Sequence, residues 1–151
     1  MGSFGEINFV YENSSFEKQK RIFYFPTPPF HFDGTFHKPS HFPDHLSLWE
    51  KGIYWQSFRV DRQLYGLKIY NQGTIEKPEL EALLFADHII GKQELELLKN
   101  EITWRFNLKA DLKEFFEIAG KDKKFSPIFK KWRGIGKIIW CWARDCPDFA
   151  F

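Results

Sequence analysis

Aromatic side chains account for 19% of this 151-residue chain, with 18 Phe and 6 Trp, and this content narrows the choice of fold more than any other property. Large flat rings favour sheet surfaces and the packing of a sheet against a helix. Hydrophobic residues make up 43% and charged residues 28%, which is ordinary globular usage and excludes disordered or collagen-like chains. The length predicts one domain, or one domain with part of another, with a core that needs no disulfides.

Short runs rich in aromatic and β-branched residues predict strands. The runs at 7–11 and 21–25 flank a polar stretch and predict an antiparallel pair. Pro26, Pro28 and Pro29 then stop the second run, because proline cannot donate to a strand ladder. The runs at 53–60 and 64–70 flank a turn and predict a hairpin. Residues 80–85 predict a further strand of the same antiparallel meander, although their composition also suits a helix.

Residues 92–106 carry the clearest helical pattern, with apolar Leu95, Leu98, Ile102 and Phe106. Glu94, Glu96, Lys99 and Glu101 lie on or near the opposite face, and Asn107 is the expected end. Two shorter helices are predicted. The first spans 111–119, with an N-cap signal from Asp111 and Glu114 and an end at Gly120. The second spans 126–133, with Ser126 as its N-cap, Pro127 at the first helical position and Gly134 as its end. Strands precede helices, so we predict an α+β fold whose antiparallel sheet is covered by helices and followed by short C-terminal helices.

The segment between these elements is harder to assign. Residues 30–43 predict an ordered loop held by buried rings, those of Phe30, Phe32, Phe36 and Phe42. Residues 44–51 have the composition of a short helix that ends at Gly52.

Positive charge is concentrated in the last third of the chain. Residues 105–144 hold 11 Lys or Arg against 4 Asp or Glu, a local excess of +7, which leaves the remainder at −5. Such a region suits a phosphate backbone. Charge alone is equally compatible with the alternative that these lysines lie on the solvated faces of short helices: Lys123, Lys124, Lys130 and Lys131.

Residues that could support catalysis or metal binding are few. His31, His37, His41 and His45 cluster, but Pro39 and Pro43 interrupt any helix that would align them, so hydrogen bonding to the backbone is the favoured role. Cys141 and Cys146 cannot form a four-cysteine zinc site, and we expect reduced thiols. Gly134 to Lys137 reads as a helix stop rather than a phosphate loop. We expect no metal and no cofactor.

Several motifs in fixed order resemble the N-terminal part of the alkyladenine and 8-oxoguanine DNA glycosylases, in the helix-hairpin-helix base-excision repair superfamily. They are 25–36 (FPTPPFHFDGTF), Trp49, 52–55 (GIYW), 67–70 (LKIY), 102–115 (ITWRFNLKADLKEF) and 129–135 (FKKWRGI). The resemblance covers residues 22–135. It implies an antiparallel sheet with helices, similar to one repeat of the TATA-binding protein fold, followed by the first helices of a catalytic domain. We accordingly divide the chain into 1–108 and 109–151.

The sequence departs from this family after Ile135. Family members continue into a helix-hairpin-helix and a loop with a catalytic Asp, joined in lyase members by a Lys, whereas 136–151 read GKIIWCWARDCPDFAF. No catalytic residue can therefore be carried over, and the chain is expected to be a truncated, inactive front half. Base excision needs a flipped base and a stacking pocket. For Trp55, Phe58, Trp104 and Trp132 a place in the core is nevertheless favoured over base stacking, because they follow apolar periodicity.

These observations predict a non-catalytic domain of a DNA glycosylase-like repair protein. Its partner would be double-stranded damaged DNA, with phosphate contacts from Lys130, Lys131, Arg133 and Lys137. The alternative is a stand-alone interaction module that binds another protein, a separate catalytic domain or a second copy of itself. No run approaches the roughly 20 apolar residues of a membrane span, and residues 1–11 do not resemble a signal peptide. We expect a soluble, cytoplasmic, nucleoid-associated protein with no membrane partner.

Overall fold

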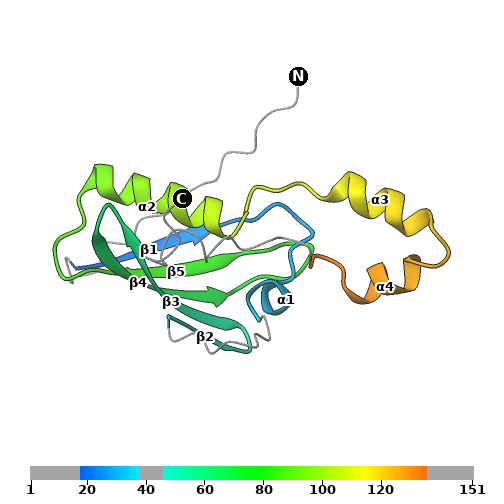
Figure 1. The fold of residues 1–151 in the computed structure, drawn as a ribbon, viewed down its shortest axis with the longest axis horizontal. Helices are drawn as coiled ribbons and strands as arrows, with labels where there is room; N and C mark the ends of the chain where they lie inside the picture. The colour runs from blue at the N-terminus through cyan, green and yellow to red at the C-terminus, as the bar shows by residue number, and fades with distance from the viewer. Residues whose placement is uncertain (1–17, 38–45, 136–151) are drawn as a thin grey trace, which may run out of the picture.

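The computed structural model describes residues 18–37 and 46–135, which form a five-stranded antiparallel sheet with helices (Figure 1). The strands are β1 (Gln19–Tyr24), β2 (Ser47–Glu50), β3 (Ile53–Val60), β4 (Gln63–Asn71) and β5 (Leu80–Phe85). The helices are α1 (Phe32–Phe36), α2 (Lys92–Arg105), α3 (Lys113–Lys121) and α4 (Ser126–Lys131). The strand order is β1-β5-β4-β3-β2. The predicted α+β class is confirmed.

Strands β2 to β5 form an antiparallel meander, and β1 pairs with β5 at its edge. Val60 pairs with Gln63, so the β3–β4 hairpin turns through Asp61 and Arg62 alone. Both turn residues have positive φ, 48° and 70°, which gives the type I′ geometry that matches strand twist. The predicted hairpin and the third strand of the meander are confirmed. The partner expected for β1 at 7–11 lies outside the described residues.

One face of the sheet carries the core. Alternate residues of β3 and β4 are buried there, among them Phe58, Leu67 and Ile69, beneath the apolar stripe of α2. Helix α1 packs on the same face, since the Phe36 ring lies 4.6 Å from Tyr54 and 4.9 Å from Phe106. Among the described helices none packs on the opposite sheet face. Alternation along the strands thus divides the sheet into a covered and an open side.

Helix α2 confirms the clearest prediction, with one correction on its polar side. Lys99 was expected near solvent, but it is only 2% exposed, and its Nζ donates to Glu96 Oε1 at 2.7 Å. Its long aliphatic stem packs in the apolar interface while the ammonium reaches an exposed carboxylate. Asn107 follows the helix with φ 49°, as an expected stop should. No helix of the described ranges has the length and apolar character needed to cross a bilayer.

The helix predicted at 44–51 is wrong, because Ser47–Glu50 is strand β2, paired antiparallel with β3. Tertiary contacts decide this short segment. Trp49 donates its indole N–H to Asp33 Oδ1 at 3.2 Å, and the same oxygen accepts from the backbone N–H of Gly52 at 2.7 Å. Gly52 has φ 77°, which allows the tight turn into β3. Strand pairing and these bonds override the local helical preference.

Between β1 and β2 the prediction was partly right. Strand β1 ends at Tyr24, before the proline segment, and Phe30, Phe32 and Phe36 are buried as expected. The loop prediction is wrong at Phe32–Phe36, which form helix α1. His31 caps this helix, because its Nδ1 accepts from Gly34 N at 3.0 Å. Histidine is not one of the usual N-cap residues, so the sequence pattern did not indicate this helix start. Phe42 lies outside the described residues.

Helices α3 and α4 exist where predicted, with shifted ends. Asp111 Oδ1 accepts from Lys113 N at 2.9 Å, but the helix begins at Lys113 and runs through Gly120 to Lys121. Ser126 is the first residue of α4 and not its cap: the N-cap position is Phe125, and in the turn before it Asp122 Oδ1 accepts two backbone N–H groups, from Lys124 and Phe125. The division of the chain after Leu108 stays a prediction.

Candidate nucleic-acid interface

Helices α3 and α4 form a hairpin that projects from one end of the sheet (Figure 1). The two helices pack through rings: Phe129 lies 5.4 Å from Phe115 and 6.1 Å from Phe116. Neither helix contains a buried residue. The hairpin is therefore an exposed extension of the sheet and not part of its core.

The base of the hairpin is joined to the segment before α1. His31 N donates to Gly134 O at 3.1 Å. Gly134 has φ 80°, and a Cβ at this position would come within 2.7 Å of His31 N, so only glycine fits. The helix stop predicted at Gly134 comes earlier in the structure, since α4 ends at Lys131 with Trp132 as its C-cap, and Gly134 instead forms a joint. Next to it, Ile135 packs against Gly34, where any side chain on Gly34 would overlap it.

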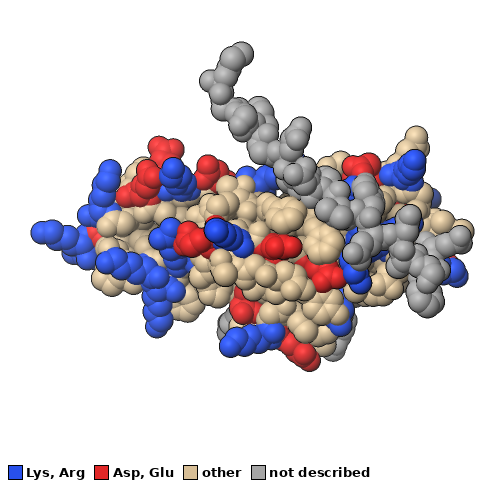
Figure 2. All heavy atoms as spheres, turned by 180° about the vertical axis from the view of Figure 1, so that it is seen from behind, with Lys and Arg blue, Asp and Glu red and all other residues tan. Residues whose placement is uncertain are grey.

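The predicted phosphate contacts meet at the base of the hairpin. Lys130, Lys131 and Arg133 are all exposed, and Figure 2 shows Lys and Arg gathered over the end of the molecule that α3 and α4 form. Lys131 Nζ lies 5.6 Å from the Trp132 ring centroid, a cation–π contact. Lys137 lies outside the described residues. The surface also includes four further exposed lysines, of which only Lys123 and Lys124 were named in the prediction, as possible solvated faces: Lys113, Lys121, Lys123 and Lys124.

Arg133 differs from its lysine neighbours because it already has an anionic partner. Its Nε lies 3.1 Å from Glu76 Oε1, and its Nη2 donates to Glu76 Oε2 at 3.2 Å. Both side chains are more than half exposed, so the pair is solvent-screened and weak. A phosphate could displace this carboxylate, whereas Lys130 and Lys131 would meet a phosphate without such competition from Glu76.

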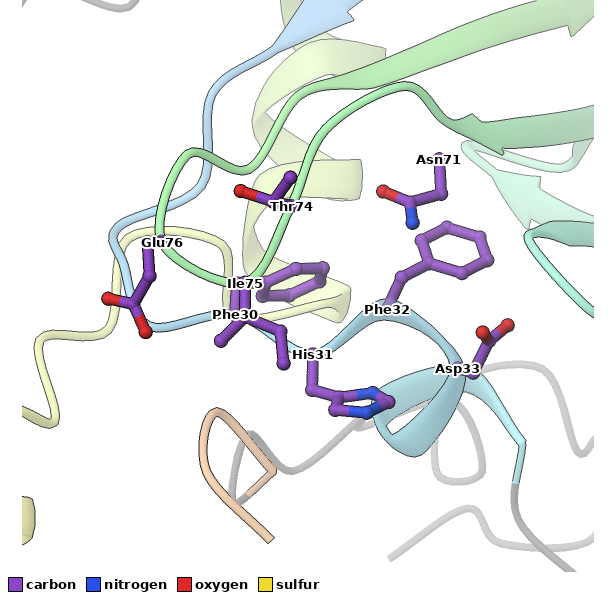
Figure 3. Close-up of a pocket in the computed structure, with 8 residues that line it drawn as sticks. All are labelled: Phe30, His31, Phe32, Asp33, Asn71, Thr74, Ile75 and Glu76. Atoms are coloured by element: carbon purple, nitrogen blue, oxygen red, sulfur yellow. The ribbon is translucent and has the colours of Figure 1, made fainter. Parts of the chain in front are cut away.

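A pocket of about 460 Å³ adjoins this basic surface (Figure 3). Its wall comes from the start of α1 and from the β4–β5 loop, which Phe30 N joins by donating to Ile75 O at 2.9 Å. The lining residues are Phe30, His31, Phe32, Asp33, Asn71, Thr74, Ile75 and Glu76. Its two carboxylates make it a poor phosphate site, and Asp33 is occupied by Trp49 and Gly52. The pocket does not bring together a nucleophile and a base, so we assign no reaction to it.

Of the four clustered histidines, the structure describes His31 and His37. His31 caps α1, as expected for a loop histidine that bonds to backbone, and the His37 ring lies 4.0 Å from the Trp49 ring. His41 and His45 lie outside the described residues. Across residues 18–37 and 46–135, no three His, Cys, Asp or Glu side chains form a metal-ligand group. The two cysteines also lie outside these ranges.

The four aromatic residues expected in the core separate into three environments. Phe58 is buried, as predicted. Trp104 and Trp132 are 50% and 51% exposed, so the core prediction is wrong for both: Trp104 lies off the buried stripe of α2, and Trp132 follows α4, which contains no buried residue. Trp55 is also outside the core: it lies half-buried on the open sheet face, where Lys68 Nζ is 4.9 Å from its ring.

The most connected polar cluster was not foreseen. At the N-terminal end of α2, opposite the hairpin in Figure 1, Glu94 Oε1 accepts from Tyr65 Oη at 2.6 Å and lies 2.6 Å from His88 Nε2. His88 Nδ1 lies 2.7 Å from Asp87 Oδ1. Glu94 Oε2 also accepts from Gly91 N at 3.1 Å. A Glu at the third position of the helix is a capping signal that could have located this cluster.

Hydrogen bonds and charges within the cluster shift the pKa values of its members. Hydrogen bonds to Asp87 and Glu94 raise the pKa of His88, and the bond from His88 lowers the pKa of Asp87. Partial burial opposes ionisation of Glu94, but bonds from Tyr65 and His88 still lower its pKa. Burial, with Glu94 nearby, raises the pKa of Tyr65. The arrangement favours a protonated imidazole between two carboxylates.

Comparison with known proteins gives one informative result. No family model matches the chain, and no curated protein matches it. Among solved structures, a 3-methyladenine DNA glycosylase from Archaeoglobus fulgidus matches with a TM-score of 0.53 and 12% identity. The match covers 77% of this chain and 38% of that one. The fold is like that of a DNA glycosylase. At this identity the likeness concerns the fold alone, and this glycosylase-like chain spans under two-fifths of the length of its neighbour.

Proposed function

We propose that this chain is the non-catalytic, sheet-bearing N-terminal domain of a DNA glycosylase-like base-excision repair protein. In that role it supports a catalytic domain and adds phosphate contacts on damaged double-stranded DNA. The observation that carries the proposal is the joint between His31 and Gly134, together with the fold likeness. It brings the 25–36 and 129–135 motifs, remote in sequence, into contact beside a basic surface.

The surface chemistry favours backbone binding over base reading. Its cations are flexible lysines on short helices, which suit sequence-independent phosphate contacts. The adjoining pocket carries two carboxylates, which would repel a phosphate, so we place the DNA backbone on the hairpin and not in the pocket.

Duplex DNA binding tests this function directly. Substituting Lys130→Ala and Lys131→Ala together should weaken binding to alkylated and undamaged duplexes equally, and it should reduce the slope of log affinity against log salt by about 2. The matched control is Lys18→Ala with Lys92→Ala, two exposed lysines at the other end of the sheet. Unchanged salt dependence in the hairpin variant, or an equal loss in the control, would contradict the proposal.

Excision is the second readout. Incubated with duplexes that contain 3-methyladenine or 8-oxoguanine, the chain alone should leave the damaged base attached. Protein-dependent release of either base would overturn the non-catalytic role while leaving DNA binding in place.

A second candidate function is a self-associating module that uses the open sheet face. Leu46, Leu48 and Phe85 are exposed there around a hollow of about 280 Å³ whose floor includes Gly66. Exposed apolar area of this kind is typical of interaction surfaces. A mass that rises with concentration in light scattering, and returns to the monomer value in Leu48→Asp, would favour this function. A constant monomer mass would exclude it.

A further inference from the structure

The α3–α4 hairpin exposes more apolar surface than its own packing can cover. Five large side chains are more than half exposed, and we call them the hairpin patch: Phe115, Ile118, Phe125, Ile128 and Trp132. Their spacing is i, i+3 on α3 and i, i+3, i+7 on α4, so each helix carries one apolar stripe. None of the described residues buries either stripe.

Helices of this size depend on apolar packing for most of their stability. The helices of the hairpin have nine and six residues, which is shorter than the roughly 12–15 residues at which isolated helices become even marginally stable. Proteins place such amphipathic helices against an apolar partner, because burial and not propensity stabilises them. The patch therefore calls for an apolar segment that lies close to it.

The chain itself supplies such a segment directly after α4. Gly134 and Ile135 are fixed at the base of the hairpin by His31 and Gly34, so the residues that follow start beside the patch. Residues 138–143 read IIWCWA, an uncharged apolar run between Lys137 and Arg144. An uncharged run matches the patch and not the lysine-rich sides of the same helices.

Length and tethering both favour this segment over a separate partner. Six extended residues span about 20 Å, more than the roughly 13.5 Å of a nine-residue helix. A segment tethered a few residues away is present at an effective concentration in the millimolar range, so it outcompetes a dilute second copy.

We propose that the apolar run at 138–143 packs on the hairpin patch of the same molecule. This goes beyond the proposed function and does not depend on it. The packing would complete a small apolar cluster around Phe116 and Phe129 and leave the lysine sides of α4 free.

Disulfide trapping in the full-length chain tests the contact, because Cys141 lies inside the apolar run and a disulfide needs Cα atoms within about 7 Å. Cys146→Ser leaves Cys141 as the single native thiol. Ile128→Cys then adds a thiol on the patch, and Lys130→Cys adds one on the same helix about 200° away. Under mild oxidation, the intramolecular disulfide should form at least about tenfold faster with Ile128→Cys than with Lys130→Cys.

Three results of the trapping experiment would overturn the proposal. Equal rates for the two positions would mean that the run has no preferred face. Failure to form a disulfide at either position would mean that the run lies elsewhere. Disulfide-linked dimers as the main product at micromolar protein would assign the patch to a second copy.

Hydrogen exchange provides an independent measurement that does not alter the patch. In the full chain, Trp140→Asp should speed exchange of the α3 and α4 amides by at least about tenfold and leave α2 unchanged. Ala150→Asp adds the same charge outside the apolar run and is the matched control. Unchanged exchange in α3 and α4 of Trp140→Asp, or an equal change in the control, would contradict the contact.

Discussion

At the scale of single residues, His88 is the group whose ionisation should control stability near neutral pH. Both ring nitrogens face carboxylate oxygens, Asp87 at 2.7 Å and Glu94 at 2.6 Å. Only the doubly protonated ring can donate to both, which agrees with its raised pKa. A group whose pKa is raised in the folded state stabilises the fold fully at pH values below its pKa in the unfolded chain. This contribution is lost as pH rises through the folded-state pKa.

The first prediction concerns this pH dependence. Wild-type stability should fall as pH rises from about 6 to about 9, while His88→Gln, which cannot gain a proton, should change less over the same range. Urea unfolding at several pH values measures the difference. Parallel curves for the two proteins would show that His88 is not the responsible group. Asp87 and Glu94, whose pKa values are lowered, act in the opposite sense and lose their contribution in acid.

Arg105 is the second decisive residue, since its guanidinium is buried at 1% exposure under the sheet. Its Nε donates to Glu101 Oε1 at 2.9 Å, its Nη2 lies 3.4 Å from Arg59 O, and its Cζ lies 5.1 Å from the Phe58 ring centroid. The ion pair therefore lies within α2, and the bond to Arg59 O ties it to β3 inside an apolar interface, where desolvation opposes charge attraction.

The expected outcome is a non-additive double mutant. Glu101→Leu alone should cost about 2–3 kcal/mol of unfolding free energy, because the buried guanidinium loses its counter-charge. Adding Arg105→Met should recover most of that loss, since an apolar pair fits an apolar interface. Urea denaturation measures all three variants. A double mutant less stable than Glu101→Leu would contradict this account.

At the scale of elements, the joint at Gly134 should govern how the hairpin is held. Gly134→Ala should cost about 1–3 kcal/mol, because alanine is strained at φ 80° and its Cβ meets His31 N. Gly120→Ala is the control. It lies inside α3 with open space around it and should stabilise by about 0.5–1 kcal/mol. Thermal unfolding with hydrogen exchange at α4 separates them, and a Gly134→Ala protein as stable as wild type would refute the joint.

Elements with long, regular patterns could be predicted from sequence, and short ones could not. A clear local pattern marks the helical stripe from Leu95 to Phe106 and the strand runs at 53–60 and 64–70. Residues 47–50 have no such pattern. They form a strand because they pair with β3 and because Trp49 bonds to Asp33, and these partners are distant in sequence. Likewise, local charge indicates the basic stretch that contains Lys130 and Lys131, but the contact between His31 and Gly134 depends on tertiary packing.

At the scale of the whole molecule, the charge asymmetry of the sequence becomes an asymmetry in space. The basic hairpin occupies one end, and the Asp87–His88–Glu94 cluster lies at the other (Figure 1). If the chain binds duplex DNA as proposed, this charge asymmetry would turn the basic end toward the polyanion during approach. The orientation precedes contact and weakens as salt screens it.

The position of the core along the chain has a consequence for biosynthesis. Among the described residues, every buried hydrophobic side chain lies between Ile22 and Leu108. A ribosome therefore releases everything needed for the sheet and its covering helix before it releases α3 and α4. The joint at Gly134 can form only afterwards, when α3 and α4 have been released and their base reaches His31.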